Sequence, residues 1–474
     1  MHLGIIGGGP GGYTAAFAAA SLGWQVTVFE REALGGVCLN HGCIPTKTLR
    51  TSADAVSLIS KLGSLGVEGV TGSAKINLEH LLARKNNVIH TLNEGLQKSF
   101  AAHKIKYIAS EATLVKDSQG QAAVKANGET TSFDAIIIAT GSAVLELPGM
   151  KFDHEYVCSS DDALTLKKLP KRLIVVGGGV IGSEMASIYR SFGCDVTIVE
   201  GQDRLLPLPS VDLDVSNLLG REFHKQKIHY HLGKTLTDVT VTGNEVKAKM
   251  VRSPFTKQPD NHAPDTELTA DMILVTIGRS PVTQGLGLDE VGVACDKRGW
   301  ITVDEHLATN VPNVYAIGDI LGPSHVMLAH VASAEALAVI DTLAGKPHSV
   351  DYAHIPSAIF SDPEIGSVGL SEEEAKNKGY EVVSDSSLMR ELGKAQAMNA
   401  LPGFFKIVAE AKTHKILGVH IVGAHSSDLI AEAALAITNN LTLEDIVKTI
   451  HAHPTLAEGF LEAATKTLHK AKSA

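Results

Sequence analysis

The chain has 474 residues, of which 44% are hydrophobic and 20% are charged. This length and composition predict two to four domains, each with a substantial apolar core, and exclude the disordered and fibrous classes. The formal net charge of -10 leaves no surplus of positive charge for phosphates, so neither nucleic acid nor a membrane surface is an expected partner.

The N-terminal residues indicate where the protein works. Met1 is followed almost at once by an apolar stretch that lacks the positive segment and cleavage pattern of a secretory signal. No run of about 18 uninterrupted apolar residues could span a bilayer. We therefore expect a cytoplasmic protein.

Two segments, residues 3 to 30 and 173 to 200, repeat one pattern of strand, glycine turn, Ala-rich helix and second strand. In both, the first strand leads into G-x-G-x-x-G, and the second strand ends in an acid, Glu30 or Glu200. The glycines are Gly7, Gly9 and Gly12 in the first copy and Gly177, Gly179 and Gly182 in the second.

This pattern suits a dinucleotide, because a pyrophosphate must approach the backbone at a helix N-terminus and the acid then binds ribose hydroxyls. One copy is weak evidence, since glycine turns also serve packing alone, but two full copies predict two dinucleotide sites. Glu200 would repel a 2′-phosphate, which favours NAD over NADP. Arg204 lies close by and could weaken that preference.

The remaining segments complete an α/β organisation. Residues 133 to 142, 270 to 281 and 313 to 320 predict further strands, the last ending at Asp319, where doubly wound sheets bind ligands. The polar, proline-containing stretch 253 to 267 predicts a surface loop that joins strands of the second domain. From about residue 346, two adjacent strands and a helix predict a third, α+β domain.

The five cysteines, at positions 38, 43, 158, 194 and 295, are too few and scattered for a disulfide framework. The close pair Cys38 and Cys43 predicts a redox-active disulfide between a substrate and an electron carrier. Zinc is the alternative, with Cys38, His41 and Cys43 as ligands, although no compact second pair completes a tetrahedral set.

The residues after the pair predict a helix beginning near Pro45, a residue favoured in a first turn. Cys43 would lie at the positive end of this helix, which lowers the pKa of a thiol. Lys47, one turn further on, adds a positive charge that can stabilise a thiolate or a reduced cofactor.

Four stretches carry a resemblance to a known family. They are GGVCLNHGCIPTKTL (35 to 49), VYAIGD (314 to 319), MLAH (327 to 330) and HAHPTLAE (451 to 458). Together they resemble the FAD-dependent pyridine nucleotide-disulfide oxidoreductases over essentially the whole chain. Within that family, the pattern looks like the members that oxidise protein-bound dihydrolipoyl groups and reduce NAD.

The resemblance implies FAD at the first glycine site and NAD at the second. The residues implied for FAD are Gly7, Gly9, Pro10, Gly12, Glu30, Gly36, Lys47, Ala112, Thr140, Gly141, Asp319 and Ala329. Those implied for NAD are Gly177, Gly179, Val180, Ile181, Glu200 and Gly278.

The catalytic residues implied by the resemblance are Cys38, Cys43, Lys47, Glu184, His453 and Glu458, with no metal ligand. Glu184 matches the position that pairs with the flavin-side lysine. His453 and Glu458 match an acid-base dyad that reaches the disulfide of the partner subunit, which implies an obligate homodimer. The chemistry fits, because a histidine titrates near neutrality and a carboxylate fixes its tautomer. His451 receives no role and is interpreted as packing.

The implied relay passes electrons from a dihydrolipoyl group to Cys38, then through Cys43 to FAD and finally to NAD. The substrate would be the lipoyl domain of a 2-oxoacid dehydrogenase complex or of the glycine cleavage system. The expected fold is two Rossmann-like doubly wound dinucleotide-binding domains plus a C-terminal α+β dimerisation domain. The expected ranges are 1–148 and 275–345 for FAD binding, 149–274 for NAD binding and 346–474 for the interface.

Two stretches depart from the family pattern, Val282 in IGRSPVT and residues 387 to 404. Both are expected to lie away from the chemistry and to affect the partner surface. The alternatives are another disulfide reductase of the family, such as a glutathione or mercuric reductase, and a non-enzymatic sensor or scaffold that binds both dinucleotides. Glu200 argues against NADP-linked reductases, and the absence of cysteine after Cys295 argues against a mercuric reductase.

Overall fold

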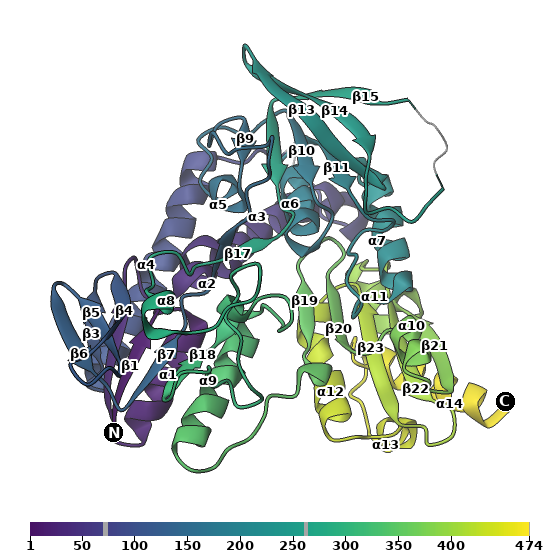
Figure 1. Ribbon diagram of the computed structural model, residues 1–474. Helices are drawn as coiled ribbons and strands as arrows, with labels where there is room; N and C mark the ends of the chain where they lie inside the picture. Colours follow the sequence, from purple (N-terminus) through teal and green to yellow (C-terminus); the bar gives the residue numbers. More distant parts are fainter. Residues whose placement is uncertain (70–73, 260–263, 474) are drawn as a thin grey trace. The chain divides into compact units, whose positions relative to one another are not determined.

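The computed structural model describes residues 1–69, 74–259 and 264–473 (Figure 1). Its contacts divide the chain into two compact units. The first unit comprises residues 1–49, 79–145 and 278–352, and the second comprises residues 50–78, 146–277 and 353–474.

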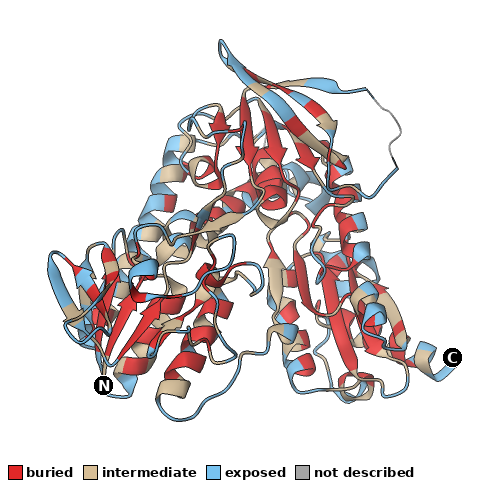
Figure 2. Ribbon diagram, in the orientation of Figure 1, coloured by how far each residue is buried: buried red, intermediate tan, exposed pale blue. Residues whose placement is uncertain are grey.

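The first unit is built on a parallel five-stranded sheet in the order β18-β7-β1-β2-β3. Its strands are β1 (His2–Ile6), β2 (Gln25–Glu30), β3 (Lys106–Ala109), β7 (Ala135–Ile138) and β18 (Val314–Ala316). The central strands are short runs of Ile, Val and Leu that are buried on both faces, as expected for a parallel sheet covered by helices (Figure 2).

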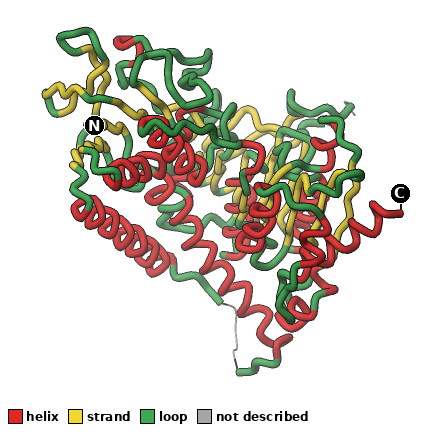
Figure 3. The backbone as a smooth tube through the Cα atoms, turned by 90° about the horizontal axis from the view of Figure 1, so that it is seen from below, coloured by secondary structure: helices red, strands yellow, loops and turns green. Residues whose placement is uncertain are grey.

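Two helices, α1 (Pro10–Ser21) and α9 (Ala329–Leu343), lie side by side along this sheet (Figure 1). Small residues allow the close approach: a Cβ on Gly11 would come within 3.3 Å of the Ala332 carbonyl oxygen. The unit also holds α2 (Gly36–His41), the start of α3 (Cys43–Lys61) and most of α4 (Leu78–Ala102), a long helix that is seen uninterrupted in Figure 3.

Smaller elements complete the first unit. They are the antiparallel sheet β4 (Ala112–Lys116), β5 (Ala122–Ala126) and β6 (Glu129–Ser132), the pair β8 (Ser142–Val144) and β17 (Arg279–Pro281), helix α8 (Leu288–Val291) and the 3-10 turns η2 (Gly318–Leu321) and, at the boundary, η3 (Tyr352–His354).

The second unit contains the second copy of the glycine pattern. Its parallel sheet has the order β12-β11-β10-β16-β9, with β9 (Val157–Cys158), β10 (Arg172–Val176), β11 (Asp195–Glu200), β12 (Ile228–Leu232) and β16 (Met272–Val275). Helices α5 (Ser160–Ala163), α6 (Val180–Ser191) and α7 (Leu213–Lys225) belong to it, as does the antiparallel sheet β13 (Lys234–Thr242), β14 (Glu245–Arg252) and β15 (Thr266–Ala270).

The same unit holds an antiparallel sheet in the order β19-β20-β23-β22-β21. Its strands are β19 (Ser357–Ile359), β20 (Ile365–Gly369), β21 (Val382–Leu388), β22 (Phe404–Glu410) and β23 (Ile416–Val422). Its helices are α10 (Glu372–Asn377), α11 (Gly393–Met398), α12 (Ser426–Thr438), α13 (Leu443–Lys448) and α14 (Glu458–Ser473), and the 3-10 turns η1 (Leu62–Leu65) and η4 (Met389–Glu391) complete the unit.

The predicted fold class is confirmed: two doubly wound sheets accompany an α+β part, and β22 and β23 are adjacent as expected. Three details differ from the sequence expectations. The helix predicted near Pro45 begins at Cys43, the segment before it forms the short α2, and β15 starts inside the stretch predicted as loop. Part of that loop, residues 260–263, lies outside the described residues. The predicted domain boundaries stay a prediction.

Candidate active site

The first glycine turn leaves its middle residue accessible. Gly7 has φ +108°, and a Cβ there would lie 2.2 Å from the Ala139 carbonyl oxygen. A Cβ on Gly12 would lie 1.9 Å from the Gly7 carbonyl oxygen, so this glycine lets α1 pack against the turn. Above Gly9, the nearest atom to such a Cβ is 3.8 Å away. The turn therefore combines tight packing with an open backbone at the helix N-terminus, as a pyrophosphate requires.

The second glycine turn has the same division of roles. Gly177 has φ +102°, and a Cβ on Gly182 would lie 1.9 Å from the Gly177 carbonyl oxygen. Among the described residues, no heavy atom outside its chain neighbours and its own helix backbone lies within 4 Å of the position that a Cβ on Gly179 would take. The residues of both copies thus fit a dinucleotide at the level of backbone geometry.

The two terminal acids are held in the same way. The Gly8 N–H donates to Glu30 Oε2 (2.8 Å), and the Gly178 N–H donates to Glu200 Oε2 (2.5 Å). In each acid the other carboxylate oxygen accepts a backbone N–H two residues further on, from Glu32 (2.9 Å) or Gln202 (2.7 Å). These bonds fix each carboxylate beside its glycine turn.

A cavity of about 70 Å³ opens beside the first turn. It brings together four residues that the sequence assigned to FAD: Gly7 in the turn, Glu30 in β2, Ala112 in β4 and Thr140, which follows β7. Its lining is completed by Ile6, Phe29, Arg31, Ser110, Glu111, Val282, Gln284, Gly285 and Leu286.

Val282 was expected to lie away from the chemistry, and that expectation is wrong. Val282 lines this cavity, its N–H donates to the Gly141 carbonyl oxygen (3.2 Å), and its own carbonyl accepts from the Thr140 hydroxyl (2.9 Å). The reason is topological: residues 140–144 and 279–282 are distant in sequence but adjacent through the β8–β17 pairing.

Asp319 lies in a polar network that the sequence did not predict. The Ser142 hydroxyl donates to Asp319 Oδ2 (2.6 Å), and Arg279 donates from Nε to the Ser142 hydroxyl (2.5 Å). Arg279 Nε also lies 3.7 Å from Asp319 Oδ2. One sequence signal pointed to this network: Ser142 and Arg279 directly follow Gly141 and Gly278, which the sequence had assigned to cofactor binding.

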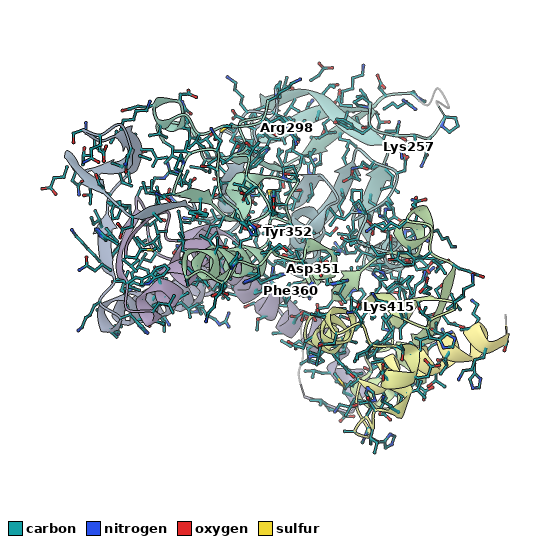
Figure 4. All side chains as sticks on the ribbon, turned by 60° about the horizontal axis from the view of Figure 1, so that its bottom comes forward. Lys257, Arg298, Asp351, Tyr352, Phe360 and Lys415 are labelled. Atoms are coloured by element: carbon teal, nitrogen blue, oxygen red, sulfur yellow. The ribbon has the colours of Figure 1, made fainter. Side chains whose placement is uncertain are left out.

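The turn that carries Asp319 is fixed from behind by a buried carboxyl group. Glu335 of α9 is 1% exposed, and its Oε2 accepts the N–H of Gly318 (2.6 Å), a glycine with φ +78°. The Tyr352 hydroxyl, labelled in Figure 4, donates to Glu335 Oε1 (2.7 Å). Burial raises the pKa of Glu335, although both hydrogen bonds act in the opposite direction.

The cysteine pair lies where two helices meet. Cys38 belongs to α2, and Cys43 is the first residue of α3. The pKa of the Cys38 thiol is raised, chiefly by the hydrogen bond it shares with Cys43 and then by burial, while the positive charge of Lys47 acts against this. The Tyr13 hydroxyl lies close enough for both thiolates to raise its pKa, although burial is the larger cause. Sequence reasoning missed Tyr13.

His41, the third potential zinc ligand, is directed to a carboxylate: its Nε2 lies 3.6 Å from Glu32 Oε2. Within residues 1–69, 74–259 and 264–473, no group of three or more His, Cys, Asp and Glu side chains could hold a metal ion.

The histidine-carboxylate dyad is formed within the second unit. Nδ1 of His453 lies 2.8 Å from Glu458 Oε1, and the Thr455 N–H donates to Glu458 Oε2 (2.8 Å). The pKa of Glu458 is lowered, first by the Thr455 N–H and then by His453. The His453 side chain is 78% exposed, so its Nε2 is left accessible from solvent.

His451 was interpreted as packing, and it is indeed buried, with a side chain 4% exposed. It nevertheless makes specific bonds: Nε2 lies 3.0 Å from Glu432 Oε1, and Nδ1 lies 3.0 Å from the Thr449 carbonyl oxygen. The pair joins α12 to the loop that carries His453.

Residues 387–404 were expected to lie away from the chemistry, and part of this stretch lies beside the loop of the dyad. An open groove of about 670 Å³ is lined by Lys394 and Met398 from this stretch and by Pro454–Ala457, directly between His453 and Glu458 in sequence. His425, Asp428 and Leu429 complete its lining. The antiparallel sheet brings the two segments together, which their separation in sequence concealed.

Arg204, which could have weakened the preference for NAD, is engaged elsewhere. Its guanidinium donates to the carbonyl oxygens of Leu208 (2.6 Å) and Val211 (2.9 Å). A 2′-phosphate beside Glu200 would therefore meet the carboxylate without help from this cation.

The other assigned residues lie within helices or at the ends of elements. Glu184 is buried in α6 and accepts the Phe360 N–H (2.9 Å), while Lys47 lies in α3. Pro10 and Val180 begin α1 and α6, Gly36 begins α2, and Ala329 begins α9. Ile181 is in the first turn of α6, and Gly141 and Gly278 directly precede β8 and β17.

No helix among the described residues is long and apolar enough to cross a membrane.

Comparison with known proteins gives consistent matches over the whole chain. The profile of the pyridine nucleotide-disulphide oxidoreductase family matches residues 1–336, and the profile of that family's dimerisation domain matches residues 355–464. Dihydrolipoyl dehydrogenase 3 of Haloarcula marismortui is 37% identical over 470 residues, which cover 98% of this chain and 96% of the relative.

Two further relatives extend this likeness. The dihydrolipoyl dehydrogenase of Bacillus subtilis is 38% identical over 464 residues, covering 97% of this chain and 95% of the relative. The crystal structure of LpdA from Mycobacterium tuberculosis superposes with a TM-score of 0.88 at 28% identity, covering 98% of this chain and 99% of that one.

Proposed function

Since the chain belongs to the pyridine nucleotide-disulphide oxidoreductase family, we propose that it oxidises protein-bound dihydrolipoyl groups to the lipoyl disulfide and reduces NAD. It is an FAD-dependent oxidoreductase that uses NAD(H). The observation that carries the proposal is the hydrogen-bonded pair Cys38 and Cys43 in the unit that holds the first glycine turn.

FAD would be held by the first glycine turn, with Glu30 on its ribose and with Asp319 and the Cys43 end of α3 further along it. The cavity beside Glu30 and Thr140, the accessible backbone of Gly9 and the fixed Asp319 carboxylate support this assignment. NAD would be held by the second turn, with Glu200 on its ribose. When bound, FAD would supply a two-electron acceptor for the cysteine pair and a hydride donor for NAD.

The protein residues perform the thiol chemistry. Nε2 of His453 takes the proton from one dihydrolipoyl thiol, and Glu458 on Nδ1 stabilises the imidazolium and fixes its orientation. The resulting thiolate attacks Cys38, the Cys38–Cys43 bond breaks, and Cys43 leaves as a thiolate. The sulfur of the second substrate thiol then displaces Cys38 and its proton passes to the departing Cys38 sulfur, which releases the lipoyl disulfide and leaves two electrons on the cysteine pair.

The hydrogen bond between the two sulfur atoms supports this order of events. Together with burial, it raises the pKa of Cys38, which favours a proton on Cys38. Cys43 at the N-terminus of α3 has the positive end of a helix beside it, which favours a thiolate. Lys47 one turn along adds a further positive charge.

The dimerisation-domain match supports a homodimer. We assign His453 and Glu458 to the cysteine pair of the partner subunit, since the His453 side chain is exposed on its own chain. The substrate would be a lipoylated carrier of a 2-oxoacid dehydrogenase complex or of the glycine cleavage system. A cytoplasmic location stays a prediction.

Anaerobic mixing of the flavin-loaded protein with dihydrolipoamide tests the proposal. Rapid reduction of NAD, slow reduction of NADP and loss of both in Cys43→Ser are expected. Cys295→Ser, an exposed cysteine outside the site, is the matched control and should keep wild-type activity. Absence of NAD reduction by the flavin-loaded dimer would overturn the proposal.

The alternatives are separated by the same material. A disulfide reductase of the family would oxidise NADH or NADPH with a disulfide such as glutathione disulfide and leave dihydrolipoamide untouched. A sensor or scaffold would bind both dinucleotides and turn over neither substrate.

A further inference from the structure

One aromatic side chain of the second unit is exposed without an evident structural reason. Phe255 is 73% exposed, whereas Tyr380, another exposed aromatic residue, is 39% exposed. Phe255 lies in the loop that follows β14, within residues 253–259, which belong to the stretch predicted as a surface loop. An isolated apolar residue on a surface is ordinary, and what distinguishes Phe255 is its surroundings.

The loop is firmly attached on its inner side. The Ser253 side chain is fully buried, its N–H donates to the Gly233 carbonyl oxygen (2.8 Å), and its hydroxyl accepts the Phe255 N–H (3.1 Å). Gly233 in turn donates its N–H to the Gln202 carbonyl oxygen (2.8 Å). A continuous chain of hydrogen bonds thus leads from Phe255 to Gln202, and the N–H of Gln202 donates to the Glu200 carboxylate.

A second attachment holds the outer side of the same loop. Asp203 accepts the Thr256 hydroxyl and, at 2.9 Å, the N–H of Lys257, which is labelled in Figure 4. The pKa of Asp203 is lowered, first by the Thr256 hydroxyl and then by the Lys257 N–H. Phe255 therefore stands between two anchor points: Ser253, which bonds to Gly233, and Thr256, which bonds to Asp203 in the segment directly after Glu200.

The position of the ring relative to β11 is the decisive observation. Cδ2 of Phe255 lies 3.5 Å from where a Cβ on Gly201 would be, so the ring lies against the residue that follows Glu200. In a nucleotide held by its ribose at such an acid, the base continues past the end of that strand. The absence of a side chain at Gly201 lets the loop approach the end of β11, since a Cβ there would lie 3.1 Å from Ser253 Oγ.

We infer that Phe255 forms a wall of the adenine subsite and that the adenine ring of NAD stacks on it. This inference rests on the proposed function, since it requires NAD at the second glycine turn. An aromatic face suits an uncharged purine, because stacking removes apolar surface of both rings from water. Phe255 is then exposed because it belongs to a binding surface that the cofactor covers.

The test is calorimetric titration of the flavin-loaded dimer with two fragments of NAD: ADP-ribose, which carries the adenine, and nicotinamide mononucleotide, which lacks it. Phe255→Ala should weaken ADP-ribose binding roughly fivefold to tenfold. This is the low end of the range for stacking one base on an aromatic side chain, because the Phe255 ring is mostly exposed. Phe255→Trp should retain wild-type affinity. Nicotinamide mononucleotide should bind all three proteins equally.

Two further variants make the outcome decisive. Tyr380→Ala, which removes an exposed aromatic ring elsewhere in the same unit, should leave ADP-ribose binding unchanged. Glu200→Ala tests the placement of NAD itself. If Glu200→Ala weakens ADP-ribose binding and Phe255→Ala does not, the adenine wall is refuted while the site stands; if neither variant weakens it, the placement of NAD at the second turn fails as well.

Discussion

Lys406 is a buried cation of the second unit, and replacing it by methionine is the sharpest test of the energetics. Its side chain is 9% exposed, and Nζ lies 3.0 Å from Asp212 Oδ1, 2.7 Å from Asp214 Oδ2 and 3.0 Å from Glu372 Oε2. Asp212 is the N-cap of α7, Glu372 begins α10 and Lys406 lies in β22, so one ammonium group joins three elements.

Lys406→Met should lower the free energy of unfolding at pH 7 by about 3–5 kcal/mol, the cost of leaving buried carboxylates without their partner. The loss comes mostly from Asp212, which is 2% exposed, because Glu372 and Asp214 can be hydrated in part. For a domain of 150–250 residues, a loss of about 3 kcal/mol corresponds to a decrease in melting temperature of roughly 6–12 °C.

The pH dependence gives a second, independent signature. Burial alone would raise the pKa of Glu372, but hydrogen bonds from Lys376, Ser384 and Lys406 outweigh it and lower the pKa to about 2. The pKa of Asp212 is lowered as well, since the charges of His420 and Lys406 and two backbone N–H groups outweigh its burial. Carboxyls with depressed folded-state pKa values stabilise the fold above their unfolded pKa and lose this contribution as the pH falls.

In Lys406→Met the same carboxylates are buried without the cation, so protonation relieves their cost instead of removing a favourable contact. The difference between wild type and variant should therefore be largest at neutral pH and should narrow between about pH 5 and pH 2.

Guanidinium unfolding of the flavin-loaded protein, followed by circular dichroism from pH 7 downwards, measures both quantities. Hydrogen exchange in α7 and β22 locates the loss. Lys376→Met is the matched control: its ammonium bonds to Glu372 at 2.6 Å but is 59% exposed, so its removal should cost less than about 1 kcal/mol. A variant of Lys406 that is as stable as this control at pH 7, or a difference that does not change with pH, would refute the reasoning.

Three further outcomes are expected. Glu458→Gln should lower turnover with dihydrolipoamide by roughly 10- to 100-fold, within the range of acid-base catalysis, and should move the acid limb of the pH–rate profile to lower pH; an unchanged profile would contradict the dyad. Arg279→Lys should weaken FAD binding, measured by flavin fluorescence on dilution, because Ser142 and Asp319 lose the planar donor that orients them; equal retention of flavin would contradict this role. Glu335→Ala should cost about 1–3 kcal/mol by leaving the Gly318 N–H without an acceptor, and Glu335→Gln should restore much of it. Because burial raises the pKa of Glu335, the wild type should lose stability as the pH rises through the carboxyl range, and Glu335→Gln should not; denaturation midpoints at pH 5 and pH 8 check this.

The glycine turns were predictable from sequence because their geometry is local. A strand, a turn that requires positive φ at Gly7 or Gly177 and a helix start are fixed within a few residues, so the spacing alone specifies the conformation. The cysteine pair is equally local, since Cys38 and Cys43 lie on two consecutive helices. Sequence alone therefore determined the fold class and the two kinds of site.

Tertiary structure decided which residues surround those sites. Val282 reaches the cavity through the pairing of β8 with β17, two strands separated by more than a hundred residues. The ring of Phe255 reaches the end of β11 because its loop bonds to Gly233 and Asp203, and no local pattern encodes those bonds. The reason is physical: a hydrogen bond between distant segments depends on how the sheets place their ends, whereas a turn or a helix cap depends only on its own residues.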